Sequence, residues 1–289
     1  MSLVYSTFDQ EALDAQYNLR PLVPHHPAVF ERYIRDSAAV VERERCTLDI
    51  AYGDARGKRL DVFRPTTDDP APVVVFIHGG YWRNKDKSDY RYLAPAFTRA
   101  GVVFVGLNYT LAPTATMDKI VDQNRSALAW LAANIADHGG DPDRIHITGH
   151  SAGGHLVAMM LTTDWTAFAG LENPIAGATA ISGLFDLEPI RLCYLNETLG
   201  LGEAEAHRNS PIHLRPTADV PLILSLGGEE TAEYHRQQDE FEVAWAPHLS
   251  AISTVEMTGL THYDVIDHLG HPGSALFHAV LDQIEGGRS

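Results

Sequence analysis

Residues 145–156 read IHITGHSAGGHL, which places Ser151 at the centre of a G-x-S-x-G pattern between an apolar, β-branched run and a run of small, helix-prone residues. This order predicts a strand that turns sharply at Ser151 into a helix beginning at Ala152. Glycines at 149 and 153 remove the Cβ atoms that such a turn would bring together. The pattern is typical of a nucleophile elbow, which exposes a serine hydroxyl at a helix N-terminus, where developing negative charge is favoured.

Strand-like runs recur on both sides of the elbow, at residues 46–52, 60–64, 73–78, 102–108, 145–148, 177–182, 222–226 and 252–257. From residue 73 onward several of these runs are continuously apolar, which indicates strands that are buried on both faces and paired in parallel. Helical segments at 88–99, 117–137, 152–162 and 233–245 supply the crossovers that parallel pairing requires. The first two runs flank a turn-rich segment and predict an antiparallel hairpin at one edge.

The alternation of strands and helices predicts an α/β fold with a mostly parallel eight-stranded sheet, an antiparallel edge hairpin and helices on both faces. Residues 1–45 precede the first strand and are expected to form an N-terminal arm. Helical periodicity fades over 184–221, where prolines interrupt short helical pieces, and this segment is expected to form a small lid. We find no internal repeat or linker, so we expect residues 1–289 to form a single domain.

The composition narrows the classes of partner. The chain of 289 residues has 22 Lys and Arg against 38 Asp and Glu, a net charge of −16, which argues against nucleic acid and anionic membranes as partners. No signal-peptide pattern or membrane-spanning run is found, so we expect a cytoplasmic protein. Cys46 and Cys193 lack metal-ligand spacing and are expected to be free thiols. We expect a small-molecule substrate and neither a metal nor an organic cofactor; the oligomeric state stays open, with a homodimer as one option.

The base for Ser151 is expected downstream, because a serine hydroxyl is a poor nucleophile at neutral pH without a histidine and an acid that orients it. His262 lies in the turn after the run at 252–257, which places it at the carboxyl end of the sheet beside the elbow. His248 precedes that run, and His268 and His271 lie further along the next segment. We therefore expect His262 to be the base.

The acid is expected in the loop GGEET at 227–231, which follows the run at 222–226. Aspartate is more usual at this place, but Asp219 precedes the strand and Asp239 falls within a helical stretch. Either Glu229 or Glu230 could reach the imidazole. We prefer Glu230, with Glu229 as the alternative.

Backbone amides at two places could stabilise the oxyanion that an acyl-transfer reaction forms. The first is the amide of Ala152, directly after the nucleophile. The second is the stretch HGGYW at 78–82, immediately after a buried strand, where glycines permit a tight turn that presents the amides of Gly80 and Tyr81.

Together, HGGYW at 78–82 and GHSAGGHL at 149–156 resemble the α/β-hydrolase fold, and within it the arylformamidase (kynurenine formamidase) branch near the hormone-sensitive-lipase-like esterases. Further similar stretches are QYNLR at 16–20, SGLFDL at 182–187 and ETAEYHRQ at 230–237. The resemblance implies a triad and an oxyanion hole, carried by Ser151, Glu230, His262, Gly80, Tyr81 and Ala152. The acid is often aspartate in this family, and a glutamate retains the orienting ability but shifts the geometry.

The aromatic residues beside these groups have two interpretations. Tyr81, Trp82 and Tyr263 could form an aromatic wall that binds an aryl substrate, or they could pack in the core. Trp82 and Tyr263 are our candidates for substrate contacts.

Three other polar residues are expected to be structural. Asp186 could be an alternative acid but fits better as a turn residue at a strand end, and Tyr17 and Arg20 are expected to hold the N-terminal arm rather than touch substrate.

The leading functional hypothesis is a serine hydrolase of N-formyl arylamides such as N-formylkynurenine. The alternatives are a carboxylesterase or small amide or lactone hydrolase with the same machinery, and a ligand-binding module that has lost catalysis. The motifs alone do not choose the substrate, because the wider group includes plain esterases and amidases.

Overall fold

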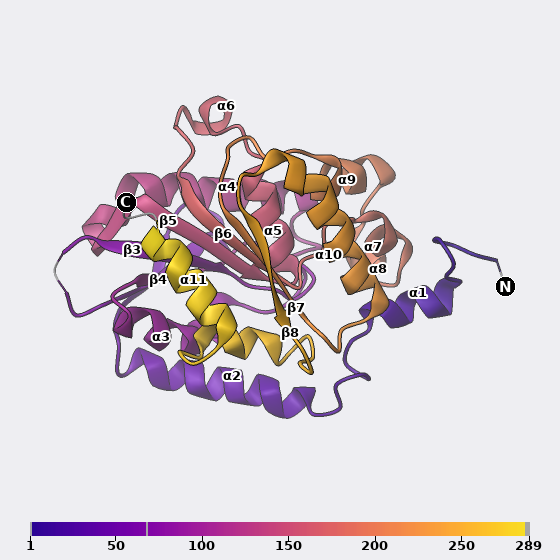
Figure 1. Ribbon diagram of the computed structural model, residues 1–289, viewed down its shortest axis with the longest axis horizontal. Coiled ribbons are helices and arrows are strands. Elements are labelled where there is room, and N and C mark those ends of the chain that lie inside the picture. Colours follow the sequence, from indigo (N-terminus) through magenta and orange to yellow (C-terminus); the bar gives the residue numbers. More distant parts are fainter. Residues whose placement is uncertain (1, 68, 287–289) are drawn as a thin grey trace.

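The computed structural model describes residues 2–67 and 69–286 (Figure 1). Its strands form one sheet in the order β1-β2-β4-β3-β5-β6-β7-β8. The strands are β1 Arg45–Ala51, β2 Arg59–Arg64, β3 Ala71–Ile77, β4 Val103–Leu107, β5 Gly140–His150, β6 Ile175–Ile181, β7 Leu222–Gly227 and β8 Ile252–Met257. β1 pairs antiparallel with β2, and β2 antiparallel with β4. The other neighbours pair in parallel. The predicted mixed sheet with an antiparallel edge hairpin is confirmed.

Burial along the strands explains this topology. Every residue of β3 and β4 is buried, as their continuous apolar sequences require of central parallel strands. The edge strand β1 instead alternates between exposed and half-buried positions. The carboxyl ends of the parallel strands therefore meet at one edge of a buried sheet, where an α/β fold places its ligand site.

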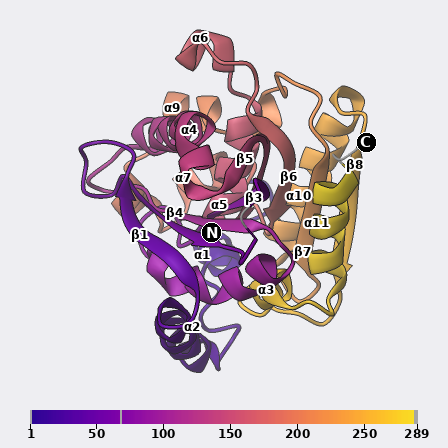
Figure 2. The same ribbon diagram turned by 90° about the vertical axis from the view of Figure 1, so that its left-hand side faces the viewer.

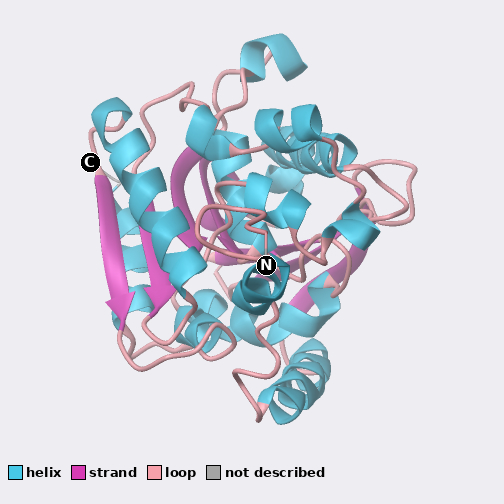
Figure 3. Ribbon diagram, turned by 90° about the vertical axis from the view of Figure 1, so that its right-hand side faces the viewer, coloured by secondary structure: helices cyan, strands magenta, loops and turns pink. Residues whose placement is uncertain are grey.

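Helices cover both faces of the sheet (Figures 2 and 3). The α-helices are α1 Gln10–Tyr17, α2 His26–Val41, α3 Ala94–Arg99, α4 Met117–Asn134, α5 Ala152–Leu161, α6 Trp165–Ala169, α7 Glu188–Leu192, α8 Asn196–Leu199, α9 Glu203–Arg208, α10 Ala232–Trp245 and α11 Ala275–Gly286. The 3-10 helices are η1 Lys87–Leu93, η2 Ile135–His138, η3 Pro211–His213, η4 Ala246–His248 and η5 Val265–Gly270. One apolar cluster joins α4, α5 and α10 to one face of the sheet, and a second joins α2, α3 and α11 to the other.

The prediction of a single α-helix over 88–99 is wrong for the first half of this segment. The segment begins as η1 and becomes α-helical only at α3, which has a proline in its first turn. Pro95 has no amide hydrogen to donate to the preceding turn, so an α-helix cannot run through it without losing a hydrogen bond.

The first part of the N-terminal arm, α1 and the loop that follows it, lies beside α10 and the site, whereas α2 packs against a face of the sheet. The Tyr17 hydroxyl at the end of α1 donates to Glu233 on α10 at 2.9 Å, so Tyr17 holds the arm as expected. Asp186 accepts from the Tyr5 hydroxyl at 2.9 Å and pairs with Arg236 at 3.3 Å, which is a structural role. Segment 184–221 contains α7, α8, α9 and η3, and its action as a lid stays a prediction.

Two composition-based expectations can be compared with the structure. Cys46 and Cys193 are both free, as expected. Within residues 2–67 and 69–286, none of the helices combines the length and apolar character needed to cross a bilayer.

Candidate active site

Ser151 occupies a sharp turn between the end of β5 and the start of α5. Its backbone has φ 59° and ψ −119°, a conformation that an ordinary residue adopts only when its surroundings impose it. The Ser151 amide donates to the Ile181 carbonyl at 2.8 Å, which holds the turn against β6. A Cβ atom on Gly149 would lie 2.3 Å from the Gly153 carbonyl oxygen, and one on Gly153 would lie 1.9 Å from the Ile77 carbonyl oxygen. The two glycines are therefore required by the close packing of β3, β5 and α5.

His262 and Glu230 form a buried hydrogen-bonded pair. The Nδ1 atom of His262, after β8, lies 2.6 Å from Oε2 of Glu230, after β7. The other oxygen, Oε1, accepts from the Ser182 hydroxyl at 2.5 Å and from the Gly227 amide at 2.9 Å. Glu229 is exposed. Of the two glutamates left open by the sequence, Glu230 is thus the one that contacts the imidazole, and its carboxylate is fixed by donors on both oxygens.

The segment after β3 adopts a run of left-handed backbone conformations. Gly80 has φ 106°, Tyr81 has φ 49° and Trp82 has φ 54°. A Cβ on Gly80 would lie 2.2 Å from the Asn84 carbonyl oxygen, so only glycine fits there. Among the loop and turn hydrogen bonds of the described residues, none is donated by the amides of Gly80 or Tyr81. Ala152 is the first residue of α5, where an amide has no partner within the helix. Free amides of this kind can stabilise an oxyanion.

Sequence reasoning assigned no role to Tyr234, although the residue lies in one of the stretches that carried the resemblance. Its ring is fully buried on α10, and burial raises the pKa of its hydroxyl well above the usual value, so the group stays neutral. The hydroxyl lies 2.8 Å from the Tyr81 hydroxyl, which in turn donates to the Tyr17 carbonyl at 2.8 Å. Tyr234 thus joins α10 to the segment after β3 and, through Tyr81, to the N-terminal arm.

Ser182 was also missed as a contributor to the site. It follows β6, has φ 49° and is fully buried. Its partner Glu230 is 48 residues away in the sequence, so no local pattern could reveal the contact.

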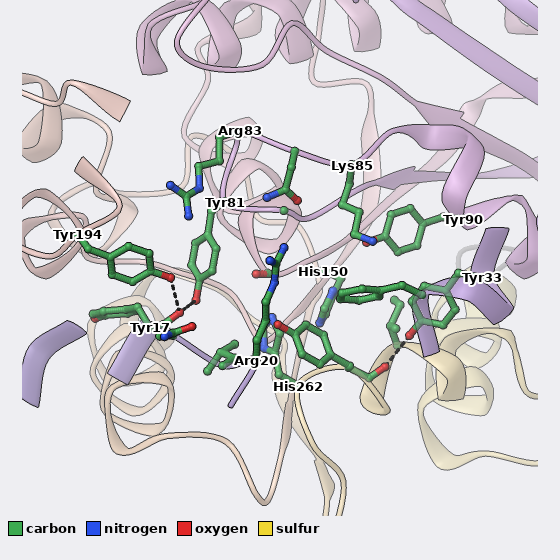
Figure 4. Close-up of a pocket in the computed structure, with 18 residues that line it drawn as sticks. Tyr17, Arg20, Tyr33, Tyr81, Arg83, Lys85, Tyr90, His150, Tyr194 and His262 are labelled. Carbon is green, nitrogen blue, oxygen red and sulfur yellow. Dashed lines mark hydrogen bonds between the residues drawn. The ribbon is translucent and has the colours of Figure 1, made fainter. Parts of the chain in front are cut away.

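One cavity of about 190 Å³ contains Ser151, His262, Gly80, Tyr81 and Tyr263 (Figure 4). The predicted nucleophile, base and one source of oxyanion donors therefore share a single space. Tyr263 also lines it, and its contact with substrate stays a prediction.

His150, directly before Ser151, also lines this cavity. Its ring centroid lies 4.5 Å from that of His262. Burial and the nearby His262 hold the pKa of His150 well below its ordinary value, so the ring is neutral and adds no charge beside the base.

Two expectations need correction. Trp82 is not a wall of the cavity: its side chain is fully buried, and Nε1 donates to His155 Nδ1 at 3.2 Å. The left-handed turn directs Trp82 toward α5 while Tyr81 lines the cavity. Arg20, expected only to hold the arm, lines the cavity, because the loop between α1 and α2 passes over it.

Comparisons with known proteins agree with this fold. The family model BD-FAE matches residues 60–182, which include the segment after β3 and the elbow. A solved Silicibacter protein, provisionally described as a thioesterase, superposes with a TM-score of 0.83 at 27% identity, covering 93% of this chain and 98% of that chain. A Pyrobaculum calidifontis esterase shares the fold with a TM-score of 0.69 at 19% identity, covering 94% and 97%.

Curated relatives identify the family. The kynurenine formamidase of Danio rerio is 30% identical over 97% of this chain and 98% of its own length. That of Salmo salar is 32% identical over 77% of this chain and 76% of its own length. The similarity to the zebrafish protein extends over nearly the whole of both chains, and carboxylic ester hydrolases are among the other relatives. The protein is therefore a hydrolase with the α/β-hydrolase fold, and the chain belongs to the kynurenine formamidase family.

Proposed function

We propose that the protein is a serine hydrolase that cleaves N-formyl arylamides, such as N-formylkynurenine, to the arylamine and formate. The observation that carries the proposal is the 2.6 Å contact between Glu230 and His262, whose ring lines the same cavity as Ser151. The formamide class is supported by the names of the full-length relatives.

Glu230 sets the tautomer of the base. A carboxylate cannot donate, so Nδ1 of His262 carries the hydrogen and Nε2 is left with a free lone pair. That lone pair takes the Ser151 proton as the hydroxyl attacks the formyl carbon. The Glu230 carboxylate then stabilises the imidazolium that forms.

The tetrahedral intermediate is stabilised by amides that are in place before the reaction. Its oxyanion accepts from Ala152 and from Gly80 or Tyr81, whose positions are fixed by the turns already described. As the intermediate collapses, the C–N bond breaks and His262 protonates the leaving aniline nitrogen. Water, deprotonated by His262, then attacks the formyl ester of Ser151 and releases formate.

The size of the cavity is compatible with one aromatic ring and a small acyl group. Its volume of about 190 Å³ exceeds the roughly 150 Å³ of an apolar cavity that accepts benzene. Aromatic side chains, among them Phe30, Tyr90 and Tyr263, supply its walls.

A series of acyl groups on one leaving group tests the proposal. The N-formyl, N-acetyl and N-butyryl derivatives of kynurenine are compared by kcat/KM, together with the corresponding phenyl esters. We expect a steep preference for formyl and no turnover by Ser151→Ala. Ready hydrolysis of phenyl butyrate with no action on any formamide would instead assign a carboxylesterase, and a wild-type protein that reacts with neither substrates nor a fluorophosphonate would assign a binding module.

A further inference from the structure

The loop that carries His262 is held by two parts of the chain that are far apart in the sequence. On the side of β7, the Glu229 amide donates to the Leu260 carbonyl at 3.0 Å, and Glu230 holds the imidazole. Helix α2 of the N-terminal arm contacts the residues that follow the base. The position of His262 therefore depends on α2 as well as on the loop that carries the acid.

Two polar contacts and one ring contact join α2 to this loop. The Tyr33 hydroxyl donates to the Tyr263 carbonyl at 2.5 Å, and Figure 4 shows this bond as a dashed line at Tyr33. Arg32 pairs with Asp267 on η5, the next element of the chain. The Phe30 ring meets the Tyr263 ring edge-on, with 5.0 Å between the centroids. A single turn of α2, residues 30–33, thus contacts the segment that begins directly after the base.

The Tyr33 hydroxyl is a fixed donor. The side chain is 2% exposed, and its ring stacks on Tyr92 of η1 with 4.7 Å between the centroids. Burial raises the pKa of the hydroxyl well above its ordinary value, so the group keeps its hydrogen at neutral pH. Its acceptor is the backbone carbonyl one residue after His262, so the bond restrains the main chain from which the imidazole projects.

The ion pair fixes η5 to the same turn of α2. Burial raises the pKa of the Asp267 carboxyl, and the hydrogen bond from Arg32 opposes this effect. Arg32 therefore stabilises a charge that burial disfavours. Both ends of segment 263–267 are tied to α2, one by the hydrogen bond of Tyr33 and the other by this ion pair.

We propose that α2 positions the catalytic base, and that Tyr33 and Arg32 are the positioning residues through which it acts. The inference rests on the proposed role of His262 and goes beyond it, because the N-terminal arm then serves catalysis without touching the reacting atoms. The base takes a proton from Ser151 and returns one to the leaving nitrogen. A small displacement of its imidazole therefore affects two proton transfers.

The variant Tyr33→Phe keeps the ring and removes the hydrogen bond. It is compared with wild type on N-formylkynurenine, whose nitrogen must be protonated to leave, and on p-nitrophenyl acetate, whose phenolate leaves without a proton. We expect kcat/KM to fall about 5- to 10-fold for the formamide and less than about twofold for the ester. KM for the formamide should stay within about twofold, because the lost hydroxyl bonds the backbone and not the substrate.

Tyr52→Phe is the matched control. Tyr52 is a buried tyrosine whose hydroxyl donates to the Asn108 carbonyl at 2.6 Å, and it does not line the cavity. The ratio of the two kcat/KM values should not change in this variant. An equal fall for both substrates in Tyr33→Phe, or the same change of ratio in Tyr52→Phe, would overturn the proposal.

Hydrogen exchange tests the position of the loop without turnover. The amides of Asp264, Val265 and Asp267 donate within the segment, so exchange of a peptide that spans 258–270 reports its opening. We expect exchange to be about threefold or more faster in Tyr33→Phe and in Arg32→Met. Arg35→Met is the control on the same helix, because Arg35 is exposed and pairs with Asp36; its exchange should match wild type.

The two measurements separate failure of this proposal from failure of the proposed function. Unchanged exchange in both variants, or faster exchange with an unchanged kcat/KM ratio, would overturn the role of α2 even if formamides are cleaved. If the wild-type protein cleaves esters alone, the formamidase assignment fails. Phenyl acetate, which has a poorer leaving group than p-nitrophenyl acetate, then replaces the formamide, and the same loss of ratio in Tyr33→Phe is expected.

Discussion

Replacing Ser182 with alanine removes one of the two hydrogen bonds to Oε1 of Glu230 and little else. The hydroxyl donates at 2.5 Å from a fully buried position, while the Gly227 amide remains at 2.9 Å. Alanine keeps the Cβ, so the φ of 49° is no more strained than before. A hydrogen bond to a charged group contributes about 1.5–3 kcal/mol. Because one donor remains, we take the lower value, which corresponds to a fall of about tenfold in kcat.

The assay is steady-state hydrolysis of N-formylkynurenine. Ser182 does not line the cavity, so kcat should fall while KM stays within about twofold. Ser225→Ala is the matched control: Ser225 is a fully buried serine of β7 whose hydroxyl donates to the Val255 carbonyl at 2.9 Å. It should lose stability to a similar extent and retain kcat.

A double-mutant cycle tests whether Ser182 affects kcat through the Glu230 carboxylate. Once Glu230→Gln has removed the charge, Ser182→Ala should lower kcat by less than about twofold more, because both changes act on one carboxylate. The reasoning would be refuted by a tenfold loss in both backgrounds, or by an equal loss of kcat in Ser225→Ala.

Three further predictions concern other parts of the site. Glu230→Gln should lower kcat about 10³- to 10⁴-fold, since the amide no longer imposes the productive tautomer of His262, whereas the exposed Glu229→Gln should retain activity; equal losses would contradict the assignment. Tyr234→Phe should lower kcat about 5- to 20-fold, because its hydroxyl is hydrogen-bonded to that of Tyr81 in the segment that carries the oxyanion amides, and an unchanged rate would show that this contact is not used. Burial lowers the pKa of His155 to about 4 in the folded protein, whereas in the unfolded chain this histidine binds a proton below about pH 6.5. The free energy of unfolding should therefore fall by about 2 kcal/mol between pH 7 and pH 4.5 because of His155. Urea unfolding at both pH values should show a smaller fall in His155→Gln.

Features encoded by neighbouring residues could be predicted from the sequence. The strands, the elbow and the edge hairpin follow from apolar runs and turn residues that are adjacent in the chain. The exception is β5, which extends back to Gly140 through a segment that reads GDPDR, because Gly140 pairs with Ala71 on β3. Tertiary pairing there overrides an unfavourable local sequence.

Features that depend on contacts between distant residues could not be predicted. Trp82 and Tyr81 are both aromatic, and only the left-handed backbone turn directs one into the core and the other into the cavity. The short stretch that contains Arg20 gave no sign that its loop lies over the cavity. Glu229 and Glu230 are adjacent and follow the same pair of glycines, so the sequence supported only a preference between them. The geometry of the loop shows that Glu230 contacts His262.

Covalent labelling of Ser151 tests the central claim most directly. The wild-type protein is treated with increasing amounts of a fluorophosphonate, and residual hydrolysis of N-formylkynurenine is compared with the labelled fraction of Ser151 measured by peptide mass spectrometry. We predict that activity falls in proportion to the labelled fraction and that Ser151→Ala is neither labelled nor active. Full hydrolysis by protein whose Ser151 is completely labelled would contradict the account.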